Sequence, residues 1–263
     1  MGRVYTLVNQ KGGVGKTTTA INLGAYLAQF GQRVLIVDAD PQANATSSLG
    51  LDKHTIKEGT YDVLLGGSPA TALVLQNPRL KLAILPASPS LAGAEVELVN
   101  ELGRESKLKN ALAPLIERYD YILIDCPPSL GLLTVNGLMA AKDGVLIPVQ
   151  CEYLALEGLG ELTHTIQRVR SALFPTLKVR GVILTMFDGR THLSQDVVAE
   201  VHKYFPERVF ETIIPRSVRL AEAPSYGLPV SAYAPGSHAA KSYEMLAREL
   251  LKSDGVVIAE IVE

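Results

Sequence analysis

A glycine-rich segment between an apolar run and a helical pattern contains the residues whose types and spacing point most directly to chemistry. The segment follows the apolar run 4–8 and reads Lys11-Gly12-Gly13-Val14-Gly15-Lys16-Thr17-Thr18. Glycines allow backbone N–H groups to turn inward around phosphate oxygens, and the N-terminus of the following helix adds partial positive charge. The strand, loop and helix in this order predict a phosphate-binding loop, or P-loop, at residues 11–18.

Two side chains of this loop suit a nucleoside triphosphate and its metal ion. We expect Lys16 to reach the β- and γ-phosphates and the hydroxyl of Thr17 to complete the Mg²⁺ shell. The loop departs from the ordinary pattern at Gln10, where glycine is usual, and it begins with a second lysine, Lys11. We therefore predict ATP and Mg²⁺ as the ligands of this loop.

Two aspartates follow apolar strands and are candidates for the rest of the site. Asp125 ends the run Ile122-Leu123-Ile124 and is suited to hold Mg²⁺ through a water. Asp40 follows the run 34–37 and is predicted to orient or polarise the attacking water beside the metal. A lone aspartate after a strand is usually a helix cap or a turn residue, but two of them beside a P-loop favour the catalytic interpretation.

Alternating strand and helix patterns position these residues. Six runs rich in Val, Ile and Leu predict strands at 4–8, 34–37, 82–85, 121–124, 145–149 and 179–184. Helical patterns lie at 18–30, 91–101, 108–118, 154–173 and 194–204. This alternation predicts an α/β fold with a doubly wound, mostly parallel sheet and helices on both faces, whose ligands bind at the carboxyl ends of the strands.

The composition fits one large domain in a reducing compartment. With 263 residues, 47% of them hydrophobic, the chain can bury a substantial core, and we expect a single domain at 1–252 and an acidic-apolar tail at 253–263. Two cysteines without metal-ligand spacing, Cys126 and Cys151, argue against a disulfide framework or a zinc site and are expected to be buried and inert. We find no signal peptide and no run of eighteen apolar residues, so we expect a cytoplasmic protein.

Several motifs together resemble those of a known family. KGGVGKTTT, VDADPQAN and ILIDCPPSLG resemble the deviant Walker A ATPases of the ParA/MinD group, which are P-loop NTPases. CEYLALEGLG, LTMFDGRT and IIPRSVRLAEAPSYGLPV resemble the chromosomal ParA (Soj) branch, so that the resemblance extends from residue 4 to about residue 250. It implies slow, Mg²⁺-dependent hydrolysis of ATP to ADP and phosphate during chromosome or plasmid partitioning, accelerated by a ParB-like centromere-binding protein.

The resemblance also implies roles for individual residues. Lys11 would reach across a nucleotide-sandwich homodimer to the partner's phosphates, and Gly12 would lie where the two subunits meet. Asp40 and Asp125 would belong to the first and second switch regions. The adenine would be framed by Pro215 and Ser217.

Two arginines match residues with which the ParA branch contacts DNA non-specifically. Arg190 and Arg219 lie in the segment 168–219, which carries nine basic and five acidic residues in a chain of net charge −2. The resemblance implies binding of double-stranded DNA, and hence association with the nucleoid, in the ATP state. The alternative is that these arginines are solvated or pair with Asp188 and Glu222.

Two other functions on the same fold are alternatives. A MinD-like positioning ATPase would end in a basic amphipathic helix, whereas SDGVVIAEIVE has three acidic and no basic residues, so we expect no membrane partner. A P-loop metabolic kinase or synthetase remains open, because its sequence signs are diffuse. We expect no helix-turn-helix module ahead of Val4 and therefore no operator-specific binding.

Overall fold

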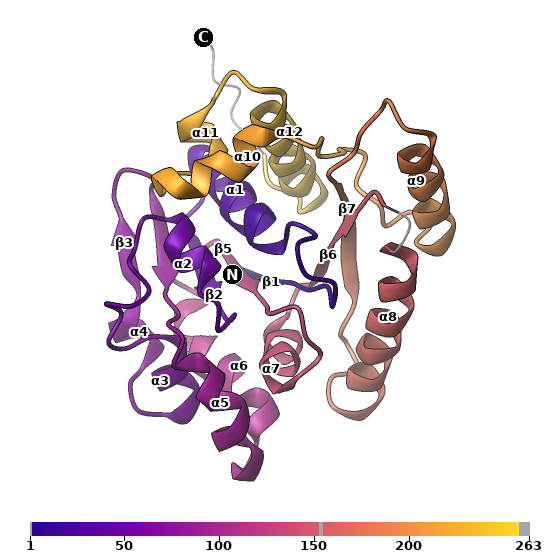
Figure 1. Cartoon of the computed structure of the whole chain (residues 1–263). Helices are drawn as coiled ribbons and strands as arrows, with labels where there is room; N and C mark the ends of the chain where they lie inside the picture. Colours follow the sequence, from indigo (N-terminus) through magenta and orange to yellow (C-terminus); the bar gives the residue numbers. More distant parts are fainter. Residues whose placement is uncertain (1, 153–154, 258–263) are drawn as a thin grey trace.

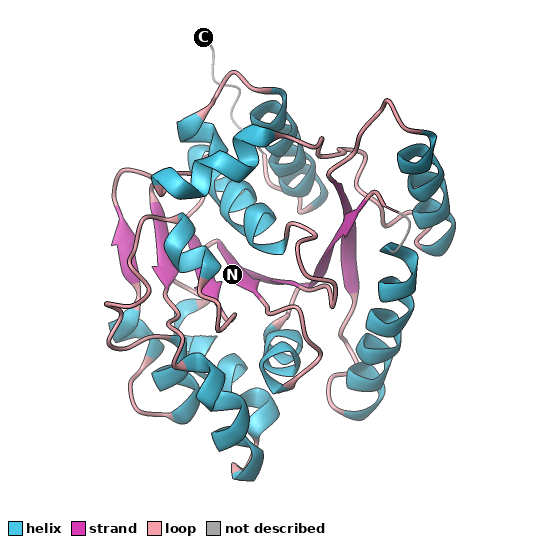
Figure 2. Ribbon diagram, viewed as in Figure 1, coloured by secondary structure: helices cyan, strands magenta, loops and turns pink. Residues whose placement is uncertain are grey.

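The computed structural model describes residues 2–152 and 155–257, which form a seven-stranded sheet flanked by helices (Figures 1 and 2). Along the sheet the strands follow the order β3-β4-β2-β5-β1-β6-β7, and every neighbouring pair is parallel except β3 and β4. The strands are β1 (Arg3–Leu7), β2 (Val34–Asp38), β3 (Leu75–Asn77), β4 (Leu82–Leu85), β5 (Tyr121–Asp125), β6 (Gly144–Gln150) and β7 (Val179–Thr185).

Helices cover both faces of the sheet (Figure 1). On one face lie α1 (Lys16–Gln29), α2 (Asn44–Ser48), α10 (Val218–Glu222), η4 (Ala223–Tyr226), α11 (Val230–Tyr233) and α12 (His238–Ser253). On the other lie α3 (Thr60–Leu65), α4 (Ala70–Leu73), α5 (Leu91–Glu97), α6 (Lys107–Leu112), α7 (Leu132–Ala140), α8 (Ala155–Ala172) and α9 (His192–Tyr204).

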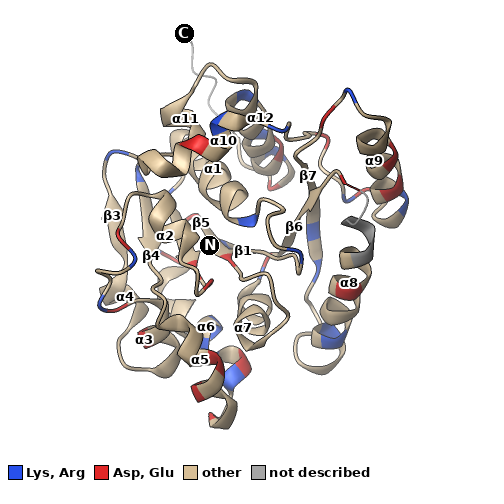
Figure 3. Ribbon diagram, viewed as in Figure 1, with Lys and Arg blue, Asp and Glu red and all other residues tan. Residues whose placement is uncertain are grey.

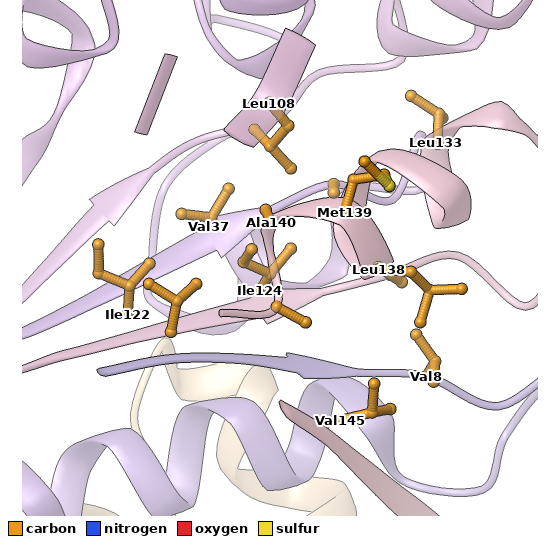
Figure 4. Close-up of a cluster of buried hydrophobic side chains, with 14 of the residues drawn as sticks. Val8, Val37, Leu108, Ile122, Ile124, Leu133, Leu138, Met139, Ala140 and Val145 are labelled. Carbon is orange, nitrogen blue, oxygen red and sulfur yellow. The ribbon is translucent and has the colours of Figure 1, made fainter. Parts of the chain in front are cut away.

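The two faces have separate hydrophobic cores because side chains alternate along each strand. In β5, Ile122 and Ile124 belong to the core under α7, while Tyr121 and Leu123 belong to the core under α1. Figure 4 shows the first of these cores, with Ile122 and Ile124 facing residues from α6 and α7. Burial on both faces explains why the parallel strands are near-continuous apolar runs.

All six predicted strands are confirmed, and the predicted fold class is correct. The short edge strand β3 was not predicted, because its three residues are mostly exposed and lack an apolar pattern. The helical pattern 108–118 ends early, since α6 stops at Leu112 and Pro114 lies in a 3₁₀ turn. Helix α7 was missed because it is buried nearly all round and has no polar face to reveal a helical period. Cys126 and Cys151 are free and buried, as expected.

The chain beyond α12 is anchored by a carboxylate. Asp254, whose side chain is 3% exposed, accepts hydrogen bonds from Tyr5 Oη (2.8 Å), Tyr121 Oη (3.0 Å) and Arg180 Nη2 (2.8 Å). Arg3 completes the ion cluster at 3.4 Å. Two residues past the expected domain boundary, the end of α12 is thus tied to β1, β5 and β7; residues 258–263 of the expected tail lie outside the described part of the chain.

We predict that Asp254→Ala lowers the free energy of unfolding by about 3 kcal/mol, because it leaves two arginines and two buried tyrosine hydroxyls without their shared acceptor. Urea denaturation followed by circular dichroism measures this change. The matched control is Glu244→Ala, which removes an exposed i,i+4 pair with Arg248 and should cost less than about 1 kcal/mol. Equal effects of the two substitutions would contradict a structural role for Asp254.

Candidate functional site

The topology brings three chain segments to one edge of the sheet. Strand β5 lies between β1 and β2, and the register aligns Asp125 with Leu7 on one side and with Asp38 on the other. The P-loop starts after β1 and Asp40 follows β2. The three neighbouring carboxyl ends therefore place the P-loop, Asp125 and Asp40 side by side, as the sequence predicted.

The P-loop is closed by the side chain of Lys16. Its Nζ donates to the backbone oxygens of Asn9 (2.9 Å) and Lys11 (3.3 Å), and the residue is 6% exposed. Burial lowers the pKa of Lys16, and the nearby carboxylate of Asp125 opposes that shift. The hydroxyl of Thr185 donates to Val14 O at 2.8 Å and ties the loop to β7. Hydrogen bonds within the subunit thus hold both the loop and the ammonium group of Lys16 in place.

Asp125 has a partnered and an unpartnered carboxylate oxygen. Thr17 Oγ1 donates to Asp125 Oδ2 at 2.6 Å, whereas Oδ1 is buried without a hydrogen-bond partner among the described residues. Burial, with a further contribution from Asp38, raises the pKa of Asp125. An oxygen of this kind suits a hydrated Mg²⁺, which is usually held by one or two carboxylates together with substrate phosphates.

Asp40 lies in a loop that a second, unpredicted aspartate holds in place. Asp40 is 6% exposed, and its Oδ1 accepts from Gln42 N at 2.9 Å. The fully buried Asp38 accepts from Thr46 N (2.8 Å) and Thr46 Oγ1 (2.7 Å), and burial raises its pKa to about 6. Asp38 therefore fixes α2, while Asp40 remains at the cavity.

Two cavities with common walls lie over the P-loop. The larger, about 430 Å³, is lined by the loop residues Gly12, Gly13 and Gly15 to Thr18, and by Asp40, Gln42, Asn44, Ser47, Ser48, Pro128, Met186 and Pro224. The smaller, about 240 Å³, shares Gly15, Thr18 and Met186 and adds Thr185, Ile214, Pro215, Arg216, Ser217, Leu220, Ala221 and Tyr243. The larger cavity is the more polar of the two and contains the P-loop, and the smaller, more apolar cavity shares walls with it, an arrangement that suits the phosphates and the base of a nucleotide.

Lys11 and Val14 line neither cavity. Lys11 N donates to Asn9 Oδ1 at 3.0 Å, which orients the start of the loop. Asn9 also donates to Pro148 O at 2.8 Å and is 3% exposed. It is a supporting residue that the sequence prediction did not name; its only signal was its place between strand and loop.

The two candidate DNA-binding arginines are exposed and paired. The side chains of Arg190 and Arg219 are 88% and 57% exposed, and they contact Asp188 at 2.7 Å and Glu222 at 2.9 Å. The alternative pairing considered from the sequence is therefore the one observed. Arg190 lowers the pKa of Asp188 to about 2 through its hydrogen bonds.

The chain segments that lead to these two arginines run side by side. Phe187 N donates to Ile214 O at 3.1 Å, and Arg216 N donates to Phe187 O at 3.0 Å. Arg190 lies three residues after Phe187, and Arg219 lies three residues after Arg216. Figure 3 shows basic and acidic residues interspersed over the rest of the described chain.

The chain matches known proteins over nearly its full length. Residues 2–179 match the model of an AAA domain family. The chromosome partitioning protein ParA of Myxococcus xanthus is 54% identical over 254 residues, covering 97% of this chain and 89% of the relative. The sporulation initiation inhibitor protein Soj of Bacillus subtilis is 52% identical, covering 95% and 98%.

Solved structures agree with this fold. A cobyrinic acid a,c-diamide synthase from Mycobacterium smegmatis, with bound ADP and magnesium, is 40% identical with a TM-score of 0.86, covering 97% of this chain and 96% of that one. The Cyanothece McdA(D38A)-ATP complex is 26% identical with a TM-score of 0.86, covering 100% and 99%. The septum site-determining protein MinD from Pyrococcus horikoshii, with Mg-ADP, is 26% identical with a TM-score of 0.77, covering 99% and 100%. With relatives of this identity across almost its whole length, the chain belongs to the ParA/Soj family of chromosome-partitioning proteins.

Proposed function

We propose that this protein is an ATP-driven switch for DNA partitioning. It binds ATP with Mg²⁺, closes into a homodimer, binds double-stranded DNA without sequence preference, and is released when ATP is hydrolysed. The observation that carries the proposal is the meeting of the P-loop, Asp125 and Asp40 at the ends of three adjacent strands. Family membership supports the cellular role.

The two joined cavities suit the parts of ATP. Lys16 and the loop N–H groups bind the phosphates in the larger cavity, and Pro215 and Ser217 frame the adenine in the smaller one. Thr17 and Asp125 hold Mg²⁺, with Asp40 beside them. When bound, the metal neutralises charge on the phosphates.

Hydrolysis requires a positioned water, and Asp40 is the side chain proposed to orient it. Its carboxylate is nearly buried, lines the phosphate cavity and is held by Gln42 N. Slow basal turnover fits an arrangement in which Asp40 is the one side chain proposed to orient the water. A ParB-like partner is proposed to accelerate it.

Two P-loop residues, Lys11 and Gly12, support the proposed dimer. Lys11 lines neither cavity, so its ammonium is available to the phosphates of a second copy. A Cβ atom added at Gly12 would meet only Pro128 Cβ, at 3.9 Å, within the subunit. A side chain at position 12 is therefore tolerated in the monomer and would obstruct only a closely apposed partner.

DNA binding is proposed to use Arg190 and Arg219 from both subunits. Each arginine must exchange an exposed carboxylate for a phosphate, and such exposed pairs are weak. A dimer doubles the number of phosphate contacts, whose counterion release adds up. We therefore propose that the protein is cytoplasmic and that, in the ATP state, it is bound to the nucleoid. No helix in the described part of the chain is long and apolar enough to cross a bilayer, and a MinD-like membrane role is not proposed.

A metabolic synthetase is the second candidate, because one 40% identical structure carries the name of a cobyrinic acid a,c-diamide synthase. The relative from Myxococcus xanthus that is named for chromosome partitioning is more similar, with 54% identity. Stimulation of ATP turnover by DNA together with a centromere-binding protein would favour partitioning, whereas stimulation by a metabolite alone would favour the synthetase.

We predict that Lys16→Ala weakens ATP binding at least about 10-fold, because a charge-assisted phosphate contact and two bonds that close the loop are lost. Fluorescent ATP-analogue titration measures the Kd. Lys252→Ala, which removes an exposed lysine in the last turn of α12, is the control and should leave the Kd unchanged. Unaltered affinity in Lys16→Ala would refute the phosphate site.

We predict that Gly12→Val remains folded and binds ATP but stays monomeric by light scattering, because the added Cβ makes only an ordinary contact with Pro128 in the subunit, whereas the side chain would collide with the partner in the dimer. The control is Gly236→Val, at an exposed glycine with nothing within 4 Å of an added Cβ, and this variant should dimerise normally with ATP. An ATP-dependent dimer of Gly12→Val would count against the nucleotide sandwich.

We predict that Arg219→Ala weakens binding to duplexes of any sequence and lowers the slope of log K against log salt by about 1–2, the contribution of one phosphate contact in each subunit. Fluorescence anisotropy at several salt concentrations measures this slope. Arg248→Ala removes another exposed, carboxylate-paired arginine, on α12, and should leave the slope unchanged. A normal slope for Arg219→Ala would place the DNA contact elsewhere.

A further inference from the structure

The segment formed by α10 and η4 has two functional faces. Ser217, Leu220 and Ala221 line the smaller cavity, and Pro224 lines the larger one. These residues are spaced three or four apart, as on one face of a helix. Arg219 points away from the cavities, and its side chain is exposed. The wall of the proposed nucleotide site is therefore also the support of a proposed DNA contact.

The end of this segment touches the chain that follows α2. Gly227, with φ +64°, closes η4, and its N–H donates to Pro224 O at 3.0 Å. A Cβ atom added at Gly227 would lie 2.6 Å from Gly50 Cα and 2.9 Å from Gly50 N. Because both of these are backbone atoms, neither can rotate away as a side chain would. The two chain segments are in direct backbone contact, and that contact requires glycine at 227.

Helix α2 connects this contact to the phosphates. Ser47 and Ser48 line the larger cavity, as does Asp40 just before the helix. Two hydrogen bonds from Thr46 to Asp38 hold the helix to the end of β2. If the Asp40 loop moves, α2 and the following Gly50 move with it. Gly50 then presses on Gly227 at the end of η4, and the neighbouring helix α10, which carries Arg219, shifts in turn.

We propose that α10–η4 couples nucleotide binding to the presentation of Arg219 within a single subunit, with the Gly50–Gly227 backbone contact as its pivot. This inference rests on the proposed function and adds to it, because dimerisation alone would not require any movement inside the subunit. The coupling implies two positions of α10–η4 in equilibrium. A nucleotide shifts this equilibrium only if its contacts differ between the two positions. We expect these differing contacts at the cavity wall formed by α10–η4 and at α2.

The first test is Gly227→Ala, whose methyl group pushes η4 away from Gly50. The quantity measured is the ratio of DNA affinities with ATP and with ADP, obtained by anisotropy on the full chain. We expect this ratio to fall by about 5-fold or more, the lower range of typical allosteric couplings, while the variant remains folded by circular dichroism. An unchanged ratio in a folded variant would overturn the proposal.

Two glycine variants separate contact from backbone strain. Gly50→Ala introduces a Cβ at ordinary distances, 3.6 Å from Gly227 Cα, in a residue with φ +82°. Gly66→Ala, at φ +78°, has the same left-handed strain and nothing within 4 Å of the added Cβ. Both should keep the parental ATP-to-ADP ratio. A loss of the ratio in Gly66→Ala as large as in Gly227→Ala would assign the effect to strain and overturn the proposed pivot.

A second measurement does not depend on the stability of Gly227→Ala. The chain has no tryptophan, so Tyr226→Trp places a single indole on η4, where the native side chain is 65% exposed. Tyr204→Trp, at the end of α9 and 66% exposed, is the matched control. We expect ATP to change the fluorescence of Tyr226→Trp, and ADP to change it less, while Tyr204→Trp stays unchanged.

The monomeric background separates this proposal from dimerisation. In Tyr226→Trp combined with Gly12→Val the ATP response should persist, because it arises inside one subunit. A response that disappears in this background would overturn the intrasubunit coupling and leave the sandwich dimer intact. A parental chain that binds DNA equally with ATP and ADP would overturn both this inference and the proposed function.

Discussion

The position of β5 between β1 and β2 is the constraint on which the rest of the molecule depends. Parallel pairing in this register aligns Asp125 with Leu7 and Asp38, so three carboxyl ends meet at one edge of the sheet. Each end contributes a different element: a P-loop, a carboxylate ending a strand, and a loop leading to α2. A shift of β5 by one residue would turn Asp125 toward the opposite core, because side chains alternate along a strand. Such a shift would also break the hydrogen bonds of Asp125 with Thr17 and of Tyr121 with Asp254.

The same edge gathers charges that are costly to bury. Asp38, Asp40 and Asp125 are nearly or fully buried, and Lys16 is the cation among them. Thr46 satisfies Asp38 through two hydrogen bonds, whereas Asp125 keeps one oxygen without a partner among the described residues. Burial raises the pKa values of both of these carboxyl groups. Asp38 has a structural role, whereas the arrangement around Asp125 is incomplete in a way that suits a cation ligand.

The two arginine pairs show how a protein with a net charge of −2 can keep exposed guanidinium groups in fixed positions. Arg219 and Arg190 are paired with Glu222 and Asp188, within three residues of each in sequence. Such pairs position the guanidinium groups while costing little to exchange for a phosphate. The segment α10–η4 also lines the two cavities over the P-loop. The proposed nucleotide site and the proposed DNA contact at Arg219 therefore share one structural element.

Features that are encoded within one short segment of the chain could be predicted from the sequence alone. The P-loop, the six strands and the carboxylates after β2 and β5 could be predicted, because each is encoded by a local pattern of glycine, apolar and acidic residues. Helix α7 could not, since burial on nearly all sides removes its helical period. Features that join distant segments were decided only by the tertiary structure: the anchoring of Asp254 by Tyr5, Tyr121 and Arg180, and the backbone contact between Gly50 and Gly227. Strand order and packing set these contacts, and neither is written in any single segment of the chain.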